Sequence, residues 1–363
     1  ARYQALGFSE LDTYFAMARG YQGESGDVKA LAMKKWFNTN YHYIVPEVED
    51  DTQICLNASK LWKEYDEAKE YGIETKPVIV GAYTFLKLCR FTGKKGVEAF
   101  TDAVVSAYKE LLTACGEKQI AWLQFDEPAL VQDMDAQDKA LFHSIYDALL
   151  VEKGSTKILL QTYFGDIRDI YDDVIRMPFD GIGLDFLEGK QTQALIGKFG
   201  FPQDKVLFAG LINGKNIWKN HYDKTLNTVH ELGKKKIQVV LSTSCSLQHV
   251  PYTLEHETKL APEYLAHFAF AKEKLMELKE VSALAENSAY TEAAEYQANQ
   301  KLFAESRNCD VAEVRQRLSK ITDSDYIRTP KRSERQKLQK EELHLPAFPT
   351  TTIGSFPQTK DVK

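Results

Sequence analysis

The chain has 363 residues, of which 44% are hydrophobic and 27% are charged, and its formal net charge is −6. This composition provides enough apolar residues for one large core or for two domains. The negative net charge argues against a general nucleic-acid-binding protein, because binding to phosphate groups needs a positive field.

The ends and the cysteines of the chain also exclude several classes of protein. No apolar run is long enough to cross a bilayer, and the first residues lack the basic and then apolar pattern of a signal peptide. The cysteines are odd in number, widely scattered and without a C-x-x-C pair: Cys55, Cys89, Cys115, Cys245 and Cys309. We therefore expect a cytoplasmic protein with no membrane partner.

Short apolar runs alternate along the chain with longer helical patterns. The predicted strands are NYHYIVP (40–46), KPVIVGAYT (76–84), AWLQFD (121–126), KILLQTYF (157–164), GIGLDF (181–186), KVLFAGLI (205–212) and IQVVLSTS (237–244). Most of these runs are continuously apolar, which is typical of parallel strands covered on both faces. The first run fits either a barrel strand or a side ribbon.

Helical periodicity predicts helices over 57–71 and 96–115, between the predicted strands. This alternation predicts an α/β fold, and both a closed (β/α)8 barrel and an open doubly wound sheet agree with it. Polar residues at strand ends favour the barrel, as at Asp126-Glu127-Pro128, Asp185 and Ser244-Cys245-Ser246, because barrel sites collect at the carboxyl ends of strands. No G-x-G-x-x-G fingerprint supports a dinucleotide-binding sheet.

After His256 the strand signal disappears. The segment from 258 to about 345 is rich in Ala, Glu, Lys and Leu and reads as successive helices, which predicts a barrel-closing helix and a long helical connector. The stretch FPTTTIGSFPQTK (348–360) then resembles the beginning of a new strand and its loop.

Six stretches taken together resemble one enzyme family. They are MKKWFNTNYHYIVPE, KPVIVGAYTFLKL, LQFDEPALV, FAGLINGKNIW, STSCSLQHVPYTLEHE and LPAFPTTTIGSFPQT. The resemblance is to the cobalamin-independent methionine synthases, which transfer a methyl group from 5-methyltetrahydrofolate polyglutamate to homocysteine. Family members are roughly twice as long, with two (β/α)8 barrels and a catalytic zinc in the second, and they use no cobalamin.

This resemblance implies how the chain is divided. We expect an N-terminal (β/α)8 barrel without its first two strands over 1–257 and a helical connector over 258–346. The first strand and loop of a second, catalytic barrel are expected over 347–363. The expected partners are the missing N-terminal strands and the C-terminal barrel, or a second copy of the chain that pairs through open sheet edges.

The resemblance also assigns individual residues. Lys35 corresponds to the lysine that binds the glutamate tail of the folate, and Ile353, Gly354 and Ser355 correspond to homocysteine and methionine contacts. Taken by themselves, Lys35 reads as a solvated charge and Gly354 as an ordinary glycine turn at a strand end. No catalytic residue and no zinc ligand is expected in this chain.

Other polar clusters have a functional and a structural interpretation. Asp126 and Glu127 suit substrate binding or acid–base chemistry, but we favour carboxylates that accept hydrogen bonds from loop N–H groups. Cys245 and His249 could suggest a metal pair, yet catalytic zinc needs at least three protein ligands. We interpret Cys245 as a relic of the barrel duplication and His249 and Glu257 as structural.

One turn and one basic segment carry the same ambiguity. Asn213-Gly214-Lys215-Asn216 suits an anion site or an asparagine-capped βα turn. The basic run Arg328, Lys331, Arg332, Arg335 and Lys337 suits contact with a polyglutamate tail, although a solvated helix face is the preferred interpretation.

Three hypotheses follow. The leading one is a portion of a zinc-dependent folate:homocysteine methyltransferase that has no turnover by itself. The alternative is a non-catalytic folate-binding or scaffold barrel module. The third is a standalone barrel enzyme with a site around Asp126, Glu127 and Cys245, which would require a complete barrel.

Overall fold

The structure is a computed structural model that describes residues 3–304, 311–351, 354 and 358–361. The chain divides into two compact units, residues 1–304 and residues 305–363. Each unit is described by itself below. Within the described ranges, no helix combines the length and the apolar character that crossing a bilayer requires.

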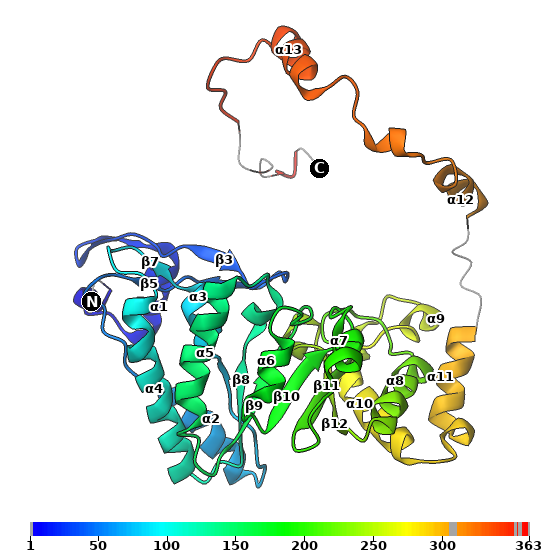
Figure 1. Ribbon diagram of the computed structural model, residues 1–363. Helices are drawn as coiled ribbons and strands as arrows, with labels where there is room; N and C mark the ends of the chain where they lie inside the picture. Colours follow the sequence, from blue (N-terminus) through cyan, green and yellow to red (C-terminus); the bar gives the residue numbers. More distant parts are fainter. Residues whose placement is uncertain (1–2, 305–310, 352–353, 355–357, 362–363) are drawn as a thin grey trace. The chain divides into compact units, whose positions relative to one another are not determined.

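The first unit is built on one parallel sheet of six strands (Figure 1). In chain order the strands are β6 (Val78–Val80), β8 (Trp122–Asp126), β9 (Lys157–Gln161), β10 (Gly181–Asp185), β11 (Val206–Ile212) and β12 (Gln238–Thr243). Their order in the sheet is β12-β11-β10-β9-β8-β6, so strands that follow one another along the chain lie side by side. All five pairs are parallel. The predicted α/β fold and six of the seven predicted strands are confirmed.

The remaining predicted strand, over residues 40–46, is not part of this sheet. Residues 40–46 contain β4 (His42–Ile44), which pairs antiparallel with β3 (Met33–Lys35). This hairpin is therefore a side ribbon and not a strand of the sheet. The physical reason is local, because only a short loop separates β3 from β4 and a short loop can only join antiparallel neighbours.

Burial along the strands explains the continuous apolar runs. Every residue of β10 is buried, and all of β9 after Lys157 is buried. By contrast β6 and β12 contain no fully buried residue. Among the described strands each of these two pairs on one side only, so β6 and β12 are the open edges of the sheet.

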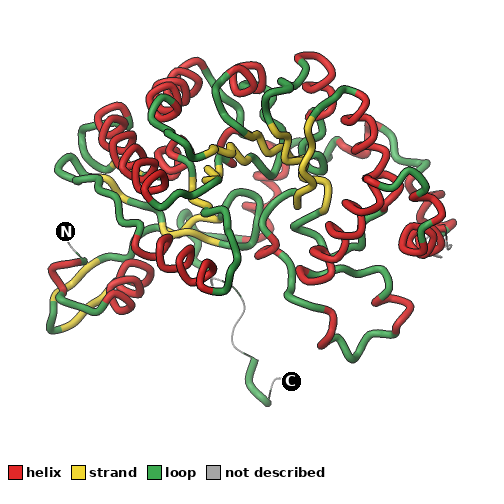
Figure 2. Tube along the Cα trace, turned by 90° about the horizontal axis from the view of Figure 1, so that it is seen from below, coloured by secondary structure: helices red, strands yellow, loops and turns green. Residues whose placement is uncertain are grey.

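Helices lie outside the sheet, which appears as an arc in Figure 2. The helices of this layer are α2 (Ser59–Glu70), α3 (Ala82–Leu88), α4 (Glu98–Glu117), α5 (Ala136–Leu150), α6 (Tyr171–Arg176), α7 (Thr192–Phe199) and α8 (Tyr222–Lys234). The predicted helices over 57–71 and 96–115 correspond to α2 and α4. On α4, Phe100, Val104 and Leu111 are all buried.

The N-terminal residues form small ribbons beside the sheet. Helix α1 (Glu10–Arg19) packs with β1 (Tyr21–Gly23) and β2 (Gly26–Val28) around a small core of its own. Farther along, β5 (Glu47–Val48) pairs in parallel with β7 (Arg90–Phe91). These ribbons and the β3–β4 hairpin lie at one end of the sheet in Figure 1.

The chain after β12 continues as helices, as predicted. After the short helix α9 (Pro262–Leu265), α10 (Ala271–Glu286) and α11 (Ala294–Ala304) both contact α8. A second core joins Ile212 and Tyr222 to Val281, Leu284 and Tyr296. The first part of the predicted connector therefore belongs to the first unit.

The second unit contains α12 (Ala312–Leu318) and α13 (Arg332–Leu343), with a short 3-10 turn, η6 (Asp323–Tyr326), between them. None of its described residues is buried. The described residues of 347–363 are assigned to no strand, and Ile353 and Ser355 lie outside the described residues. The predicted strand at this end therefore stays a prediction.

Candidate functional site

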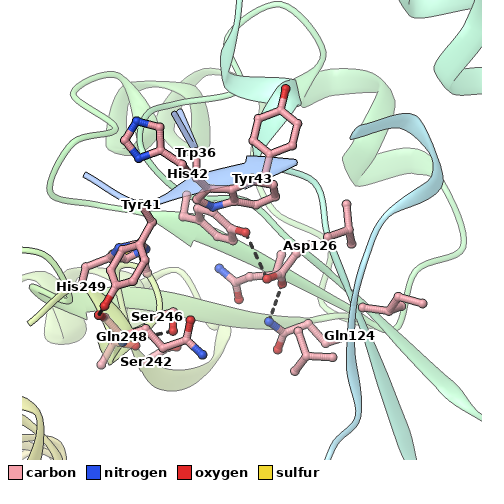
Figure 3. Close-up of a pocket in the computed structure, with 17 residues that line it drawn as sticks. Trp36, Tyr41, His42, Tyr43, Gln124, Asp126, Ser242, Ser246, Gln248 and His249 are labelled. Atoms are coloured by element: carbon pink, nitrogen blue, oxygen red, sulfur yellow. Dashed lines mark hydrogen bonds between the residues drawn. The ribbon is translucent and has the colours of Figure 1, made fainter. Parts of the chain in front are cut away.

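A cavity of about 740 Å³ lies at the carboxyl ends of the strands (Figure 3). It joins the two open edges of the sheet, because β6 contributes Val78, Ile79 and Val80 and β12 contributes Ser242 and Thr243. The remaining lining residues come from the hairpin, from β8 and β9, and from the loops after β9 and β12: Trp36, Tyr41, His42, Tyr43, Gln124, Asp126, Gln161, Tyr163, Cys245, Ser246, Gln248 and His249.

Asp126, at the end of β8, is the carboxylate of this cavity. Its side chain accepts hydrogen bonds from Gln124 Nε2 at 2.7 Å and from the Tyr163 hydroxyl at 3.1 Å (Figure 3). Burial raises the pKa of Asp126 to about 6, although these two bonds favour its charged form. Burial also lowers the pKa of Lys76, a nearby cation, to about 8. Asp126 therefore changes its charge close to neutral pH.

Glu127, the next residue, has a structural environment. It is fully buried, and its two carboxylate oxygens accept from the backbone N–H groups of Tyr83 at 3.0 Å and Thr84 at 2.7 Å. The Tyr146 hydroxyl donates to the same carboxylate. A side chain at Gly81 would meet Glu127 Oε1 at 2.1 Å, so only glycine fits there. Glu127 thus fixes the start of α3, as the preferred interpretation predicted.

The β3–β4 hairpin is fastened over the cavity by four loops of the sheet. Trp36 packs against Tyr163, Phe164 and Cys245. At the hairpin tip, Asn38 Nδ2 donates to Glu188 Oε2 at 2.8 Å.

Two further contacts complete this attachment. Lys215 Nζ lies 2.7 Å from Glu188 Oε1 and 5.1 Å from the centre of the Phe164 ring. The Tyr41 hydroxyl donates to the carbonyl oxygen of Gln248 at 2.6 Å. The loops after β9, β10, β11 and β12 therefore all contribute to holding the hairpin.

Lys35 lies at the end of β3 on this hairpin. It is exposed and pairs with His42, while the equally exposed Lys34 pairs with Tyr43. Because successive side chains of a strand point to opposite faces, Lys34 and Lys35 face in opposite directions. Trp36 and both cross-strand neighbours, His42 of Lys35 and Tyr43 of Lys34, line the cavity, whereas neither lysine does. Lys35 therefore lies next to lining residues and is not itself part of the lining.

Among the predicted homocysteine contacts, only Gly354 is described. It belongs to the second unit and has φ +78°, a backbone conformation that glycine adopts without strain. Lys35 belongs to the first unit.

The candidate metal pair lines the cavity without forming a metal site. No group of three or more His, Cys, Asp or Glu side chains converges among the described residues. Burial raises the pKa of the Cys245 thiol to about 12, whereas zinc binds a thiolate. Burial also lowers the pKa of His249, and Glu257 is not among the residues that line the cavity. These residues do not fit a catalytic zinc.

The turn after β11 is held by its own asparagine. Asn213 Oδ1 accepts from the N–H groups of Lys215 at 2.9 Å and Asn216 at 2.8 Å, which is the geometry of an asparagine-capped turn. At the end of the neighbouring strand β10, the carboxylate of Asp185 accepts hydrogen bonds from three backbone N–H groups, those of Phe164, Leu187 and Glu188. Both polar strand ends therefore stabilise loops.

The sequence interpretation missed several residues of this site. Gln124 and Asp126 are two apart on β8 and so point to the same face of the strand. Because Asp126 was already recognised at the strand end, the two-residue period of a strand could have identified Gln124 as a second residue of the site. Nothing in the linear sequence links Tyr41 to Gln248 or Asn38 to Glu188, which the fold brings together over 207 and 150 positions.

A parallel sheet covered by helices, with a polar cavity at the carboxyl ends of its strands, defines the α/β class in which ligand sites lie at that edge. Comparison with known proteins narrows this class. The chain belongs to the cobalamin-independent synthase family, because the family described as "Cobalamin-independent synthase, N-terminal domain" matches residues 1–237.

Two curated relatives carry the same protein name, 5-methyltetrahydropteroyltriglutamate–homocysteine methyltransferase. The one from Campylobacter jejuni subsp. doylei is 52% identical over 362 residues, which is 100% of this chain and 48% of the relative. The one from Streptococcus pneumoniae is 51% identical over 365 residues, 100% of this chain and 48% of the relative. The chain thus spans about half the length of these relatives.

A solved structure of a B12-independent methionine synthase from Shewanella sp., in complex with selenomethionine, is also similar. It is 15% identical, with a TM-score of 0.47, and the match covers 68% of this chain and 71% of that chain.

Proposed function

We propose that this chain is the N-terminal portion of a methyltransferase that makes methionine from homocysteine and 5-methyltetrahydrofolate polyglutamate. The observation that carries the proposal is the identity of 51–52% along the whole chain to relatives named for that reaction. The chain contributes contacts to the folate's glutamate tail and part of the homocysteine site, and it has no turnover by itself.

The fold supports an incomplete (β/α)8 barrel. Six parallel strands lie in sequential order, and the two edge strands line one cavity. A closed barrel of this type has eight strands, so two further strands between β12 and β6 would complete it. We propose that strands from outside this chain, or a second copy of the chain, occupy this place. On this view 1–257 is barrel, 258–346 is connector, and 347–363 begins the second barrel.

Lys35 is the proposed contact for the glutamate tail. Lys35 is exposed, its cross-strand neighbour His42 lines the cavity, and four loops hold the hairpin in place. A flexible ammonium is a suitable partner for the separate carboxylates of a γ-linked tail. Because an exposed pair of charges gains little in water, Lys35 is expected to select the tail and not to provide most of the affinity.

Ile353, Gly354 and Ser355 are the proposed homocysteine contacts. The positive φ of Gly354 supports this assignment, because it allows the backbone to turn and approach a ligand closely. The zinc that the resemblance implies does not fit the described residues, so the proposal assigns no metal-dependent step to this chain. What the chain does is bind and orient substrate.

The experiment compares the binding of tetrahydropteroyl triglutamate and monoglutamate to the purified chain by calorimetry. We expect tighter binding of the triglutamate, and we expect Lys35→Ala to weaken triglutamate binding about three- to tenfold without changing monoglutamate binding. Lys34→Ala is the matched control, since Lys34 is equally exposed on the opposite face of β3.

Two outcomes would contradict the proposal. One is equal binding of both folates to the unaltered chain. The other is an equal effect of Lys34→Ala and Lys35→Ala, which would show a general effect of positive charge.

A non-catalytic folate-binding or scaffold module is the second candidate. It is favoured by the structural use of Glu127 and by the raised pKa of the Cys245 thiol, which together remove two of the three residues of a standalone site. This candidate predicts the same folate binding, and it differs in predicting no methionine formation with any complementary polypeptide.

A further inference from the structure

The turn of the β3–β4 hairpin carries backbone strain. Phe37 has φ +51°, and Phe164, in the loop after β9, has φ +73°. A bulky side chain at a positive φ is an outlier, and it persists only where the surrounding structure fixes it. The two rings lie together, with their centroids 6.1 Å apart. Strain at two neighbouring residues indicates that the contacts around them hold the hairpin in one conformation.

The hairpin cannot fix its own position. Strands β3 and β4 have three residues each, and among the described strands they pair only with each other. An isolated two-stranded hairpin is at best marginally stable in water. The place of this hairpin on the sheet therefore depends on what its side chains contact in the loops.

Glu188 joins the tip of the hairpin to the loop after β11. Its Oε2 accepts from Asn38 Nδ2 at 2.8 Å and from Lys215 Nζ at 2.9 Å, and its Oε1 lies 2.7 Å from Lys215 Nζ. The side chains of Glu188 and Lys215 are 30% and 25% exposed. This pair is thus partly shielded from the solvent that weakens exposed ion pairs.

Phe164 belongs to the same set of contacts. Lys215 Nζ lies 5.1 Å from the centre of the Phe164 ring. The buried carboxylate of Asp185 accepts from the backbone N–H groups of Phe164 at 3.0 Å and Glu188 at 2.9 Å. Because one carboxylate fixes both backbones, Phe164 and Glu188 meet the hairpin turn in a fixed arrangement.

We propose that Glu188 is a positioning residue for the glutamate tail of the folate, because it fixes the hairpin, and with it the backbone of Lys35, before the folate binds. The inference rests on the proposed contact of Lys35 with the tail, and it adds the residue that makes this contact selective. Lys35 is three positions before Asn38 on the same hairpin. A segment that is ordered before binding does not lose affinity to its own ordering.

The test measures the binding of tetrahydropteroyl triglutamate and monoglutamate to the purified chain by calorimetry. Glu188→Ala should weaken triglutamate binding about threefold and leave monoglutamate binding unchanged. Asn38→Ala removes the hairpin's side of the same contact and should have the same effect.

Asp66→Ala is the matched control. It also removes one negative charge and one ion pair, since Asp66 Oδ2 lies 3.0 Å from Lys118 Nζ, but this pair joins α2 to α4 and includes no residue of the hairpin. Asp66→Ala should leave the binding of both folates unchanged.

The decisive variant combines Glu188→Ala with Lys35→Ala. A residue that acts through Lys35 has no effect once Lys35 is removed, so the double variant should bind the triglutamate as Lys35→Ala does. A residue that merely stabilises the fold would weaken binding by the same factor with and without Lys35.

Several results would overturn the proposal. They are triglutamate binding that Glu188→Ala or Asn38→Ala leaves unchanged, an equal loss of binding for both folates, and a loss that persists in the Lys35→Ala background. Failure of the proposed function has a different pattern, because it appears as equal binding of both folates to the unaltered chain or as equal effects of Lys34→Ala and Lys35→Ala. The positioning role would then be refuted as well.

Discussion

The titration of Asp126 gives a prediction whose sign and approximate size follow from its burial. Burial raises its pKa to about 6, from an ordinary value of about 3.9. The folded chain therefore holds this proton more tightly than the unfolded chain. Between about pH 4 and pH 6 the folded state binds more protons, so its free energy of unfolding falls as the pH rises.

The size of this effect follows from the difference in pKa. About two pKa units correspond to roughly 3 kcal/mol at 1.36 kcal/mol per unit. Asp126→Asn removes the titration but keeps a side chain that can bond to Gln124 and Tyr163. We therefore expect the variant to gain about 3 kcal/mol relative to the unaltered chain between pH 4 and pH 8, on top of a constant offset of about 1 kcal/mol for altered hydrogen bonds.

Urea unfolding followed by tryptophan fluorescence measures this difference at a series of pH values. The control is Asp51→Asn, which removes an exposed carboxylate. Parallel stability curves for the unaltered chain and Asp126→Asn would refute the argument that burial in the cavity perturbs this carboxylate.

Three further predictions concern Glu127, Glu188 and the reactivity of two cysteines. Glu127→Ala leaves three buried donors unpaired and a cavity, so urea unfolding should show a loss of about 3–5 kcal/mol, and a loss below 1 kcal/mol would contradict its role. Glu188→Gln weakens the ion pair with Lys215 that helps to hold the hairpin. Amide hydrogen exchange should therefore accelerate about tenfold in β3 and β4 and stay unchanged in β9 and β10. The same change in exchange rate in all four strands would contradict the attachment. Iodoacetamide at pH 8 should modify the exposed Cys55 and leave Cys245 unmodified, since burial raises the pKa of Cys245 to about 12, and rapid modification of Cys245 would show that the site is open.

The sheet could be predicted from the sequence because its interior strands are buried on both faces. The runs that became β9 and β10 are apolar at nearly every position, and only a covered parallel sheet accommodates such runs. The run at 40–46 contains similar residue types, but its partner β3 was not recognised, since three residues carry too little pattern. Short ribbons depend on tertiary contacts more than on their own sequence.

The candidate site was predictable only in part. The acidic strand end at Asp126 was identified from its position, and acceptance of hydrogen bonds from loop N–H groups was the preferred interpretation of both carboxylates, which is confirmed for Glu127. For Asp126 the donors are instead the side chains of Gln124 and Tyr163. The attachment of the hairpin could not be predicted, because Tyr41 and Gln248 are 207 positions apart in the sequence and only the tertiary structure brings them together. The same is true of the distinction between Lys34 and Lys35, which depends on the register of the hairpin.

The most direct test of the central claim is methionine formation by a reconstituted enzyme. This chain is mixed with a separately purified polypeptide that carries the remainder of the Campylobacter jejuni relative, together with homocysteine, 5-methyltetrahydropteroyl triglutamate and zinc. We predict methionine from the mixture and none from this chain alone, with Lys35→Ala lowering the rate at limiting triglutamate and Lys34→Ala leaving it unchanged. Methionine from this chain alone, or a stable complex of the two polypeptides that forms none, would contradict the account.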